Sequence, residues 1–131
     1  MNVIEKYAKT LSQLQMDLDL FDPNAVEMCP REGVSNLKGF SESLKRWFPR
    51  LEKIVVKNII CKHVDYDHVH QLHGVVFLEV YYKVKHGEAK IDAVHVVITN
   101  EQEKILSVNS FWALSQYDEL ALKHPELKQA H

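Results

Sequence analysis

The stretch from residue 74 to residue 114, GVVFLEVYYKVKHGEAKIDAVHVVITNEQEKILSVNSFWAL, decides the fold of this chain. It is rich in Val, Ile, Phe and Tyr, which favour strands, and turn formers interrupt it at 85–87 (KHG) and 100–103 (NEQE). The pattern predicts an antiparallel meander of three strands, Val75–Val84, Glu88–Thr99 and Lys104–Leu114. The rest of the chain must pack around this meander.

Both faces of the meander are expected to be covered, because side chains alternate between the two faces of a strand and both sets are largely apolar here. In the second strand one face carries Val94, Val96 and Ile98, and the other carries Ile91, Ala93, His95 and Val97. In the first strand one face carries Val76, Leu78, Val80, Tyr82 and Val84, and the other carries Val75, Phe77, Glu79, Tyr81 and Lys83. The mixed character of this last face is typical of a protein interface. We expect helices of the same chain on one face and a second copy, forming a homodimer, on the other.

The length and composition indicate one globular domain over residues 1–131. With 46% hydrophobic and 26% charged residues, the chain lies outside the disordered class. A net charge of -2 argues against a nucleic-acid partner, which would favour a basic surface. The longest basic cluster, Lys45-Arg46 with Arg50 nearby, is interpreted as a solvated helix end.

The two cysteines, Cys29 and Cys61, are too few for a disulfide framework and lack CxxC spacing. We therefore expect reduced thiols in a cytoplasmic protein. No apolar run has the length of a signal-peptide core at the N-terminus, and none approaches the roughly 18 to 20 residues of a membrane span. The sequence predicts no membrane association.

The N-terminal half is predicted to contain two amphipathic helices around a short strand. Helical spacing of apolar residues predicts a helix over Asn2–Leu14, with Tyr7 in its buried stripe. Asp22-Pro23-Asn24 is expected to form a turn, followed by a strand over Ala25–Cys29 and a loop over Arg31–Ser35. A second helix, capped by Ser35 or Asn36, is expected to start near Leu37, or only at Gly39, and to end at Pro49.

Two further elements flank the meander. Leu51–Val64 is a long β-prone run, and a turn at 65–67 is expected to lead into His68–His73. After the meander, Ser115–Asp118 has the form of a capping box, which predicts a short helix that frays beyond Pro125.

This order of elements carries a family resemblance. The relevant segments are Leu-Phe-Asp-Pro-Asn-Ala-Val at 20–26, the helix ending Phe48-Pro49, His-Gly-Glu at 86–88, and Glu-Lys-Ile-Leu-Ser-Val at 103–108. The chain resembles the nuclear transport factor 2-like superfamily, in particular its SnoaL-like and ketosteroid-isomerase-like branch. The resemblance implies an α+β cone-shaped roll, with a strongly curved, mostly antiparallel sheet wrapped around N-terminal helices. It also implies a cavity for a small apolar ligand and a dimer through the outer sheet face.

The same resemblance implies three candidate catalytic residues, Tyr7, Glu27 and His95. Ketosteroid isomerases carry a tyrosine in the first helix, which Tyr7 matches. Where they carry a general-base aspartate, this chain has Cys29 before Pro30, with Glu27 two residues earlier on the same face. His95 stands where they carry a protonated aspartate. These departures mean that steroid isomerisation itself is not predicted.

The chemistry of these residue types fits proton transfer next to an oxygen. Such a reaction needs a carboxylate base and a neutral donor at the developing negative charge. Tyr7 and a neutral His95 could supply donors, and Glu27 could serve as the base if its strand turns it into the cone. The alternatives are a core tyrosine, a solvent-exposed glutamate, and a structural histidine tied to a neighbour such as Asn109.

Four histidines, His63, His68, His70 and His73, form the other conspicuous group. His68 and His70 share a predicted strand face, and imidazole pairs at that spacing bind zinc, copper or iron. We favour ordinary surface histidines and predict neither a metal nor a cofactor.

Two functions remain open from the sequence. One is a small isomerase, cyclase or hydrolase acting on an apolar molecule, with Cys29, Trp47, Asn109 and Phe111 lining the pocket beside the three catalytic candidates. The other is a non-catalytic ligand-binding or assembly module, in which Trp47, Phe48, Phe111 and Trp112 fill the cone. An open pocket shared by His95 and a carboxylate would favour the enzyme.

Overall fold

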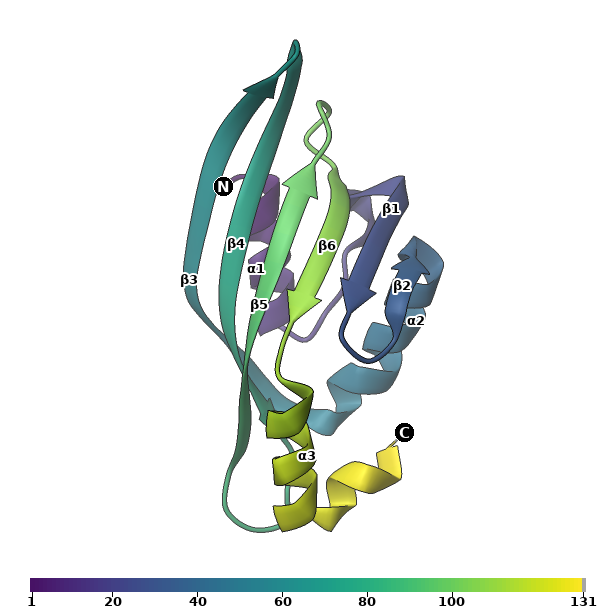
Figure 1. Cartoon of the computed structure of the whole chain (residues 1–131), viewed down its shortest axis with the longest axis vertical. Coiled ribbons are helices and arrows are strands. Elements are labelled where there is room, and N and C mark those ends of the chain that lie inside the picture. Colours follow the sequence, from purple (N-terminus) through teal and green to yellow (C-terminus); the bar gives the residue numbers. More distant parts are fainter. Residues whose placement is uncertain (131) are drawn as a thin grey trace.

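The computed structural model describes residues 1–130 as a curved six-stranded sheet with helices packed on one of its faces (Figure 1). The strands lie in the order β2-β1-β6-β5-β4-β3, and each neighbouring pair is antiparallel except β1 with β6. The strands are β1 (Phe21–Cys29), β2 (Gly33–Asn36), β3 (Leu51–Tyr66), β4 (Val69–Tyr82), β5 (Ala89–Thr99) and β6 (Ile105–Phe111). The helices are α1 (Val3–Ser12), α2 (Leu37–Trp47) and α3 (Leu114–Lys123), with short 3-10 segments η1 (Leu18–Leu20), η2 (Phe48–Arg50) and η3 (Pro125–Ala130). The predicted α+β architecture is confirmed.

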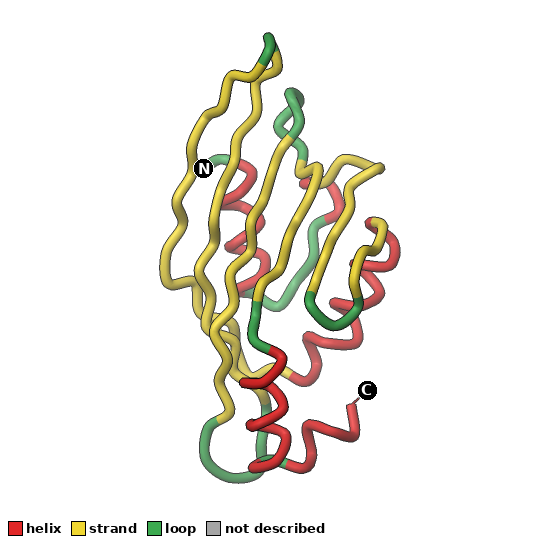
Figure 2. Tube along the Cα trace, in the orientation of Figure 1, coloured by secondary structure: helices red, strands yellow, loops and turns green. Residues whose placement is uncertain are grey.

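The predicted meander corresponds to β4, β5 and β6. β4 is longer than expected, because it continues through Gly74 and includes most of the segment 68–73 that was predicted as a separate strand. β6 ends at Phe111 instead of Leu114, because α3 begins at Leu114. Figure 2 shows that β3 and β4 extend as a long hairpin beyond the rest of the sheet.

The region around β1 and β2 differs from the prediction. β1 begins at Phe21 and runs through the expected turn at 22–24, and an irregularity in its pairing with β6 between Phe21 and Val26 absorbs these residues. β2 occupies part of the expected loop and pairs antiparallel with β1. The turn between them uses Gly33 at φ +75°, a conformation that glycine adopts without steric cost.

The helix ends also refine the prediction. Asn36 caps α2 by accepting a hydrogen bond from the backbone N–H of Gly39, so the helix begins at Leu37. The predicted capping box at Ser115 is wrong, because α3 already begins at Leu114, after Ala113, which makes no side-chain cap.

The two faces of the sheet differ in burial within the chain, although the residues on both are largely apolar. The inner face packs against α1 and contributes fully buried side chains to the core, among them Val76, Val80, Ile91 and Val97. The outer face of the same strands is only partly buried, and Phe77 and Phe111 are 37% and 55% exposed there. The outer face is therefore the apolar surface that the chain does not cover with its own helices.

Gly74 fixes the distance between α1 and β4. A Cβ atom at this position would lie 2.7 Å from Cδ1 and 2.9 Å from Cγ2 of Ile4, which is itself fully buried. Overpacking of this kind costs about 1–3 kcal/mol, so we expect Gly74→Ala to lower the free energy of unfolding by that amount in urea titrations. In an Ile4→Ala background the same change should cost far less, because the clashing atoms are gone. Additive costs of the two changes would contradict this account of the contact.

Candidate functional site

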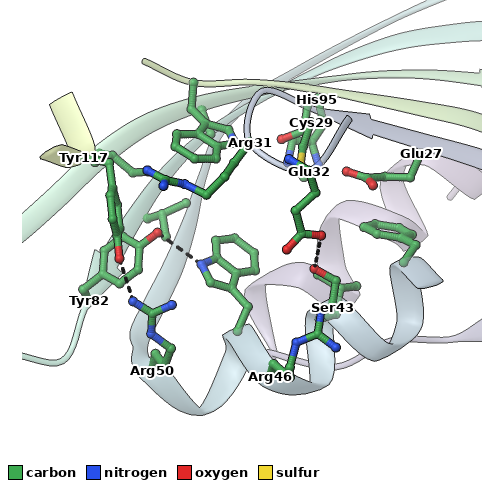
Figure 3. A pocket seen from close by; sticks show the side chains of 18 residues that line it. Glu27, Cys29, Arg31, Glu32, Ser43, Arg46, Arg50, Tyr82, His95 and Tyr117 are labelled. Atoms are coloured by element: carbon green, nitrogen blue, oxygen red, sulfur yellow. Dashed lines mark hydrogen bonds between the residues drawn. The ribbon is translucent and has the colours of Figure 1, made fainter. Parts of the chain in front are cut away.

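A cavity of about 410 Å³ lies between α2, the turn that joins β1 to β2, the inner face of the sheet and α3 (Figure 3). Its volume falls within the range of roughly 300–1,000 Å³ that is usual for small-molecule sites. Apolar and aromatic side chains form most of the wall, including Phe40, Trp47, Ile91 and Trp112. Charged and polar side chains complete the wall, among them Glu27 and His95.

His95 is held on β5 by a buried tyrosine. The hydroxyl oxygen of Tyr7, on α1, lies 2.8 Å from Nδ1 of His95. Burial raises the pKa of the Tyr7 hydroxyl, so the hydroxyl keeps its proton at neutral pH. A buried O–H group needs an acceptor, and Nδ1 is the one in reach. The imidazole of His95 therefore carries its own proton on Nε2.

The same burial keeps His95 uncharged. Only 4% of the residue is exposed, and this desolvation lowers its pKa from 6.5 to about 4. At neutral pH the ring is a neutral hydrogen-bond donor through Nε2, and His95 belongs to the cavity wall. The contact partner is Tyr7 and not Asn109, the neighbour suggested by the sequence.

Glu27 supplies a buried carboxyl group from β1. The register pairs Glu27 with Ser35 of β2, and the Ser35 hydroxyl donates to the Glu27 carboxylate at 2.9 Å. Burial raises the pKa of Glu27, the nearby Glu32 carboxylate raises it further, and the Ser35 hydrogen bond opposes both. A carboxylate in this setting is more basic than one in water. Glu27 thus combines access to the cavity with strength as a proton acceptor.

The structure distributes the predicted site residues over the cavity wall, the protein core and the outer face of the sheet. Glu27, Cys29, Trp47 and His95 line the cavity. Tyr7 lies behind His95, in the core, and is not part of the cavity wall.

Asn109 and Phe111 instead belong to the outer face of the sheet. They pair with Val96 and Val94 of β5, whereas their neighbour Ser110 lines the cavity. Successive side chains of β6 point to opposite faces of the sheet. Neither Asn109 nor Phe111 can therefore contact a molecule in the cavity.

Several cavity residues were not singled out as site residues from the sequence. Arg46 and Arg50 line the cavity, although their cluster was interpreted as a solvated helix end. Arg31 and Glu32 enter from the short turn between β1 and β2, and Tyr117 from α3. The sequence signal for Arg31 and Glu32 was a charged loop before a helix, which does not indicate where the loop lies in the fold.

The four histidines lie along the hairpin of β3 and β4. His70 pairs with Asp65 across the hairpin, and this contact raises the pKa of His70. His73 contacts the side chain of Gln71 at 3.0 Å. His68 lies in the turn at φ 66°, so it does not share a strand face with His70 as expected. Across residues 1–130, no group of three or more His, Cys, Asp and Glu residues is arranged to hold a metal ion.

Comparison with known proteins identifies the fold. No protein-family model matches the sequence, and no curated protein matches it significantly. The BvnE pinacolase from Penicillium brevicompactum superposes with a TM-score of 0.68 at 14% identity, over 98% of this chain and 94% of its own. A putative polyketide cyclase from Xanthomonas campestris pv. campestris gives 0.66 at 9% identity, over 88% and 90%. A nuclear transport factor 2-like protein of unknown function from Exiguobacterium sp. 255-15 gives 0.54 at 10% identity, over 86% and 99%.

The chain therefore has the nuclear transport factor 2-like fold, as the resemblance in its sequence implied. In this chain the fold consists of a curved mixed sheet with helices packed on its inner face. At identities this low, the similarity establishes the fold alone.

Proposed function

We propose that this protein is an enzyme that moves a proton on a small, mostly apolar molecule carrying a carbonyl or comparable oxygen. The observation that supports the proposal is that one open cavity is lined by both a buried carboxyl group of raised pKa, Glu27, and a neutral imidazole, His95. A general base works best when its pKa is brought closer to the working pH, and burial does this for Glu27.

In the proposed reaction, the Glu27 carboxylate takes a proton from the carbon next to the substrate carbonyl. The electron pair of that C–H bond forms a carbon–carbon double bond, and the carbonyl electrons move to oxygen. The Nε2–H of His95 donates a hydrogen bond to this oxygen as it gains negative charge. Glu27 then returns the proton to another carbon of a conjugated substrate and the carbonyl re-forms, which gives isomerisation. Alternatively, the carbanion attacks a second carbonyl in the same molecule, and the alkoxide that forms takes the proton from Glu27, which gives cyclisation.

Tyr7 is proposed to act as a positioning residue. Its O–H group occupies Nδ1 of His95, so the imidazole proton stays on Nε2 and the ring stays neutral. A neutral donor is useful here, because a charged imidazolium would hold its proton less firmly and would be costly to bury.

The structural neighbours are compatible with this proposal. One is a putative polyketide cyclase and another a pinacolase, so proteins named for enzymatic reactions share this fold. The cavity of about 410 Å³ with a largely apolar wall suits a molecule of that kind.

The alternative, a non-catalytic module, receives less support. In such a module, aromatic side chains were expected to fill the cone. Instead, Trp47 and Trp112 form a wall around open volume, and Phe111 lies on the outer face. The deciding experiment is an NMR screen of apolar ketones and polyketide-like compounds for conversion, followed by comparison of the wild-type protein with Glu27→Gln. Absence of any difference between the two would leave the module as the better account.

We also propose a homodimer through the outer sheet face. Phe77, Val94 and Phe111 form one cross-strand row on β4, β5 and β6, and Met28 and Val34 continue the exposed apolar surface onto β1 and β2. Exposed apolar surface of this extent is unusual for a monomer and is characteristic of an interface.

The dimer predicts a clear response to one substitution. Phe111→Asp should convert a dimer into a monomer in sedimentation-velocity experiments at micromolar concentration, because it buries a charge at the centre of the interface. Leu122→Asp is the matched control, since Leu122 is 73% exposed on α3 and is not part of the sheet, and it should leave the dimer intact. A wild-type protein that sediments as a monomer would contradict the proposal.

Within residues 1–130, no helix has the length and apolar character needed to cross a membrane. The two cysteines are unpaired, in keeping with the reduced state expected from the sequence. A cytoplasmic location stays a prediction that fractionation of cells would test.

A further inference from the structure

We propose that the molecule bound in this cavity is an apolar carboxylic acid, held with its carboxylate against Arg31 and Arg50, at the end of the cavity away from Glu27. The inference concerns the same site as the proposed function and names its substrate class. Five charged side chains line the cavity: Arg31, Arg46, Arg50, Glu27 and Glu32. Arg31 and Arg50 give the cavity a cationic end, and Glu27 and Glu32 lie toward the other end.

Arg31 provides the cationic group that is best placed to contact a ligand. Its guanidinium carbon lies 5.2 Å from the ring centre of Tyr117 and 5.9 Å from that of Trp112, so two aromatic rings hold the group in place. Its ion pair with Asp118 is long, at 3.4 Å, and Asp118 is largely exposed to solvent. A guanidinium has five N–H donors in a planar fork, which leaves Arg31 able to bind a carboxylate in the cavity.

Arg50 reinforces the positive charge at the same end. It donates to the Tyr117 hydroxyl at 2.7 Å and to the backbone carbonyl of Leu127 at 3.1 Å, and its guanidinium carbon lies 5.8 Å from the ring centre of Tyr82. These contacts fix the position of the charge. Figure 3 shows Arg50, Tyr82, Tyr117 and the Arg31 side chain together at one end of the cavity.

The opposite end carries both acidic groups, and Arg46 lies on that side as well, near Ser43 (Figure 3). Glu27 lies across the cavity from Tyr117, and Glu32 accepts a hydrogen bond from Ser43 at 3.2 Å (Figure 3). A ligand carboxylate near this pair would meet like charge in a partly desolvated space, whereas the arginine end offers charge-assisted hydrogen bonds. The charge distribution therefore selects both an anionic ligand and its orientation.

The space between the two ends is suited to a flat apolar body. Trp47 and Tyr82 form part of this wall. The Trp47 indole N–H donates to the Tyr82 hydroxyl at 3.1 Å, so both rings are fixed and the indole N–H already has a hydrogen-bond partner. With the carboxylate at Arg31 and Arg50, the far end of the ligand lies toward Glu27 and His95. An apolar acid with a second oxygen function at that far end meets all these requirements.

The test is a binding comparison that does not depend on turnover. Isothermal titration with naphthalene-2-acetate and with its neutral analogue, naphthalene-2-acetamide, should show at least about tenfold tighter binding of the acid, the size expected for a charge-assisted contact. Arg31→Gln should abolish this preference. Lys45→Gln is the matched control, because it removes the same charge from an exposed residue of α2 that does not line the cavity, and it should retain the preference.

Equal binding of acid and amide by the wild-type protein, or no binding of either at millimolar concentration, would overturn the proposal. So would an unchanged preference in Arg31→Gln. Glu27→Gln separates this inference from the proposed function: it should keep the preference for the acid while losing turnover. If Glu27→Gln retains both, the acid–base role fails and the carboxylate site stands.

Discussion

Replacement of Glu27 by glutamine is expected to lower the turnover number by about 10²- to 10⁴-fold, the usual contribution of a general base. Glutamine keeps the size of the side chain and can still accept the hydrogen bond from Ser35. It cannot take up a proton at neutral pH, so binding of the substrate should change little while the chemical step is lost. The measurement is the rate of substrate conversion, or of exchange of the substrate proton with deuterium oxide, by NMR.

Glu32→Gln provides the matched control, because Glu32 lines the same cavity but bonds to Ser43 on an exposed rim. Its turnover should remain within about tenfold of the wild type, since a rim charge acts on the pKa of Glu27 only at a distance. Far-ultraviolet circular dichroism and the urea midpoint of both variants establish that each is folded. Equal losses in Glu27→Gln and Glu32→Gln would contradict the assignment of the base.

Acidification is expected to destabilise the protein through His95. The folded chain holds this imidazole at a pKa of about 4, whereas the unfolded chain protonates it at 6.5. Between these values only the unfolded chain binds the proton, so the free energy of unfolding falls as the pH falls from 6.5 toward 4. Above pH 6.5 His95 is neutral in both states and does not lower the free energy of unfolding. Below about pH 4 the full loss of stability has occurred. The difference between them corresponds to about 3 kcal/mol.

The prediction is tested by the difference between two proteins. His95→Gln offers an acceptor to the Tyr7 hydroxyl but does not titrate, so its stability should fall by about 3 kcal/mol less than that of the wild type over this pH range. Glu27 has a raised pKa and acts in the opposite direction in both proteins, so its effect largely cancels in the comparison. Urea titrations at closely spaced pH values give the two curves.

His70→Gln is the control for this experiment. His70 is exposed on the hairpin, and its contact with Asp65 raises its pKa instead of lowering it. His70→Gln should therefore lose as much stability as the wild type when the pH falls from 6.5 toward 4. Parallel stability curves for the wild type and His95→Gln would show that His95 does not carry the effect.

Much of the fold could be predicted because it depends on local pattern. The β-prone residues from Val75 to Thr99 and the turn formers between them identified the strands, and the two-residue period of a strand divided their side chains into the two faces that the structure shows. Errors occurred where context overrides local signals. The Asp22-Pro23-Asn24 segment looks like a turn, yet it is carried within β1, where the irregular pairing with β6 tolerates a proline.

The candidate site was predicted less completely. The structure places Glu27, Cys29, Trp47 and His95 at the cavity wall, and their roles there stay predictions. Asn109 and Phe111 were expected there too, but the pairing of β6 with β5 turns both to the outer face. A change of one residue in register reverses the direction of every side chain in a strand, and no property of the β6 sequence alone fixes that register.

The sequence by itself determined the α+β class, the meander, the buried stripe of the first helix and the presence of a polar histidine in an apolar strand, since each follows from residue spacing of 2 or about 3.6. Only the tertiary structure decided what His95 does. Its partner Tyr7 is 88 residues away along the chain, and Arg31 and Arg50 reach one end of the cavity from separate elements. Such groups are brought together by the packing of the helices on the sheet, which depends on contacts across the whole chain and not on any local stretch.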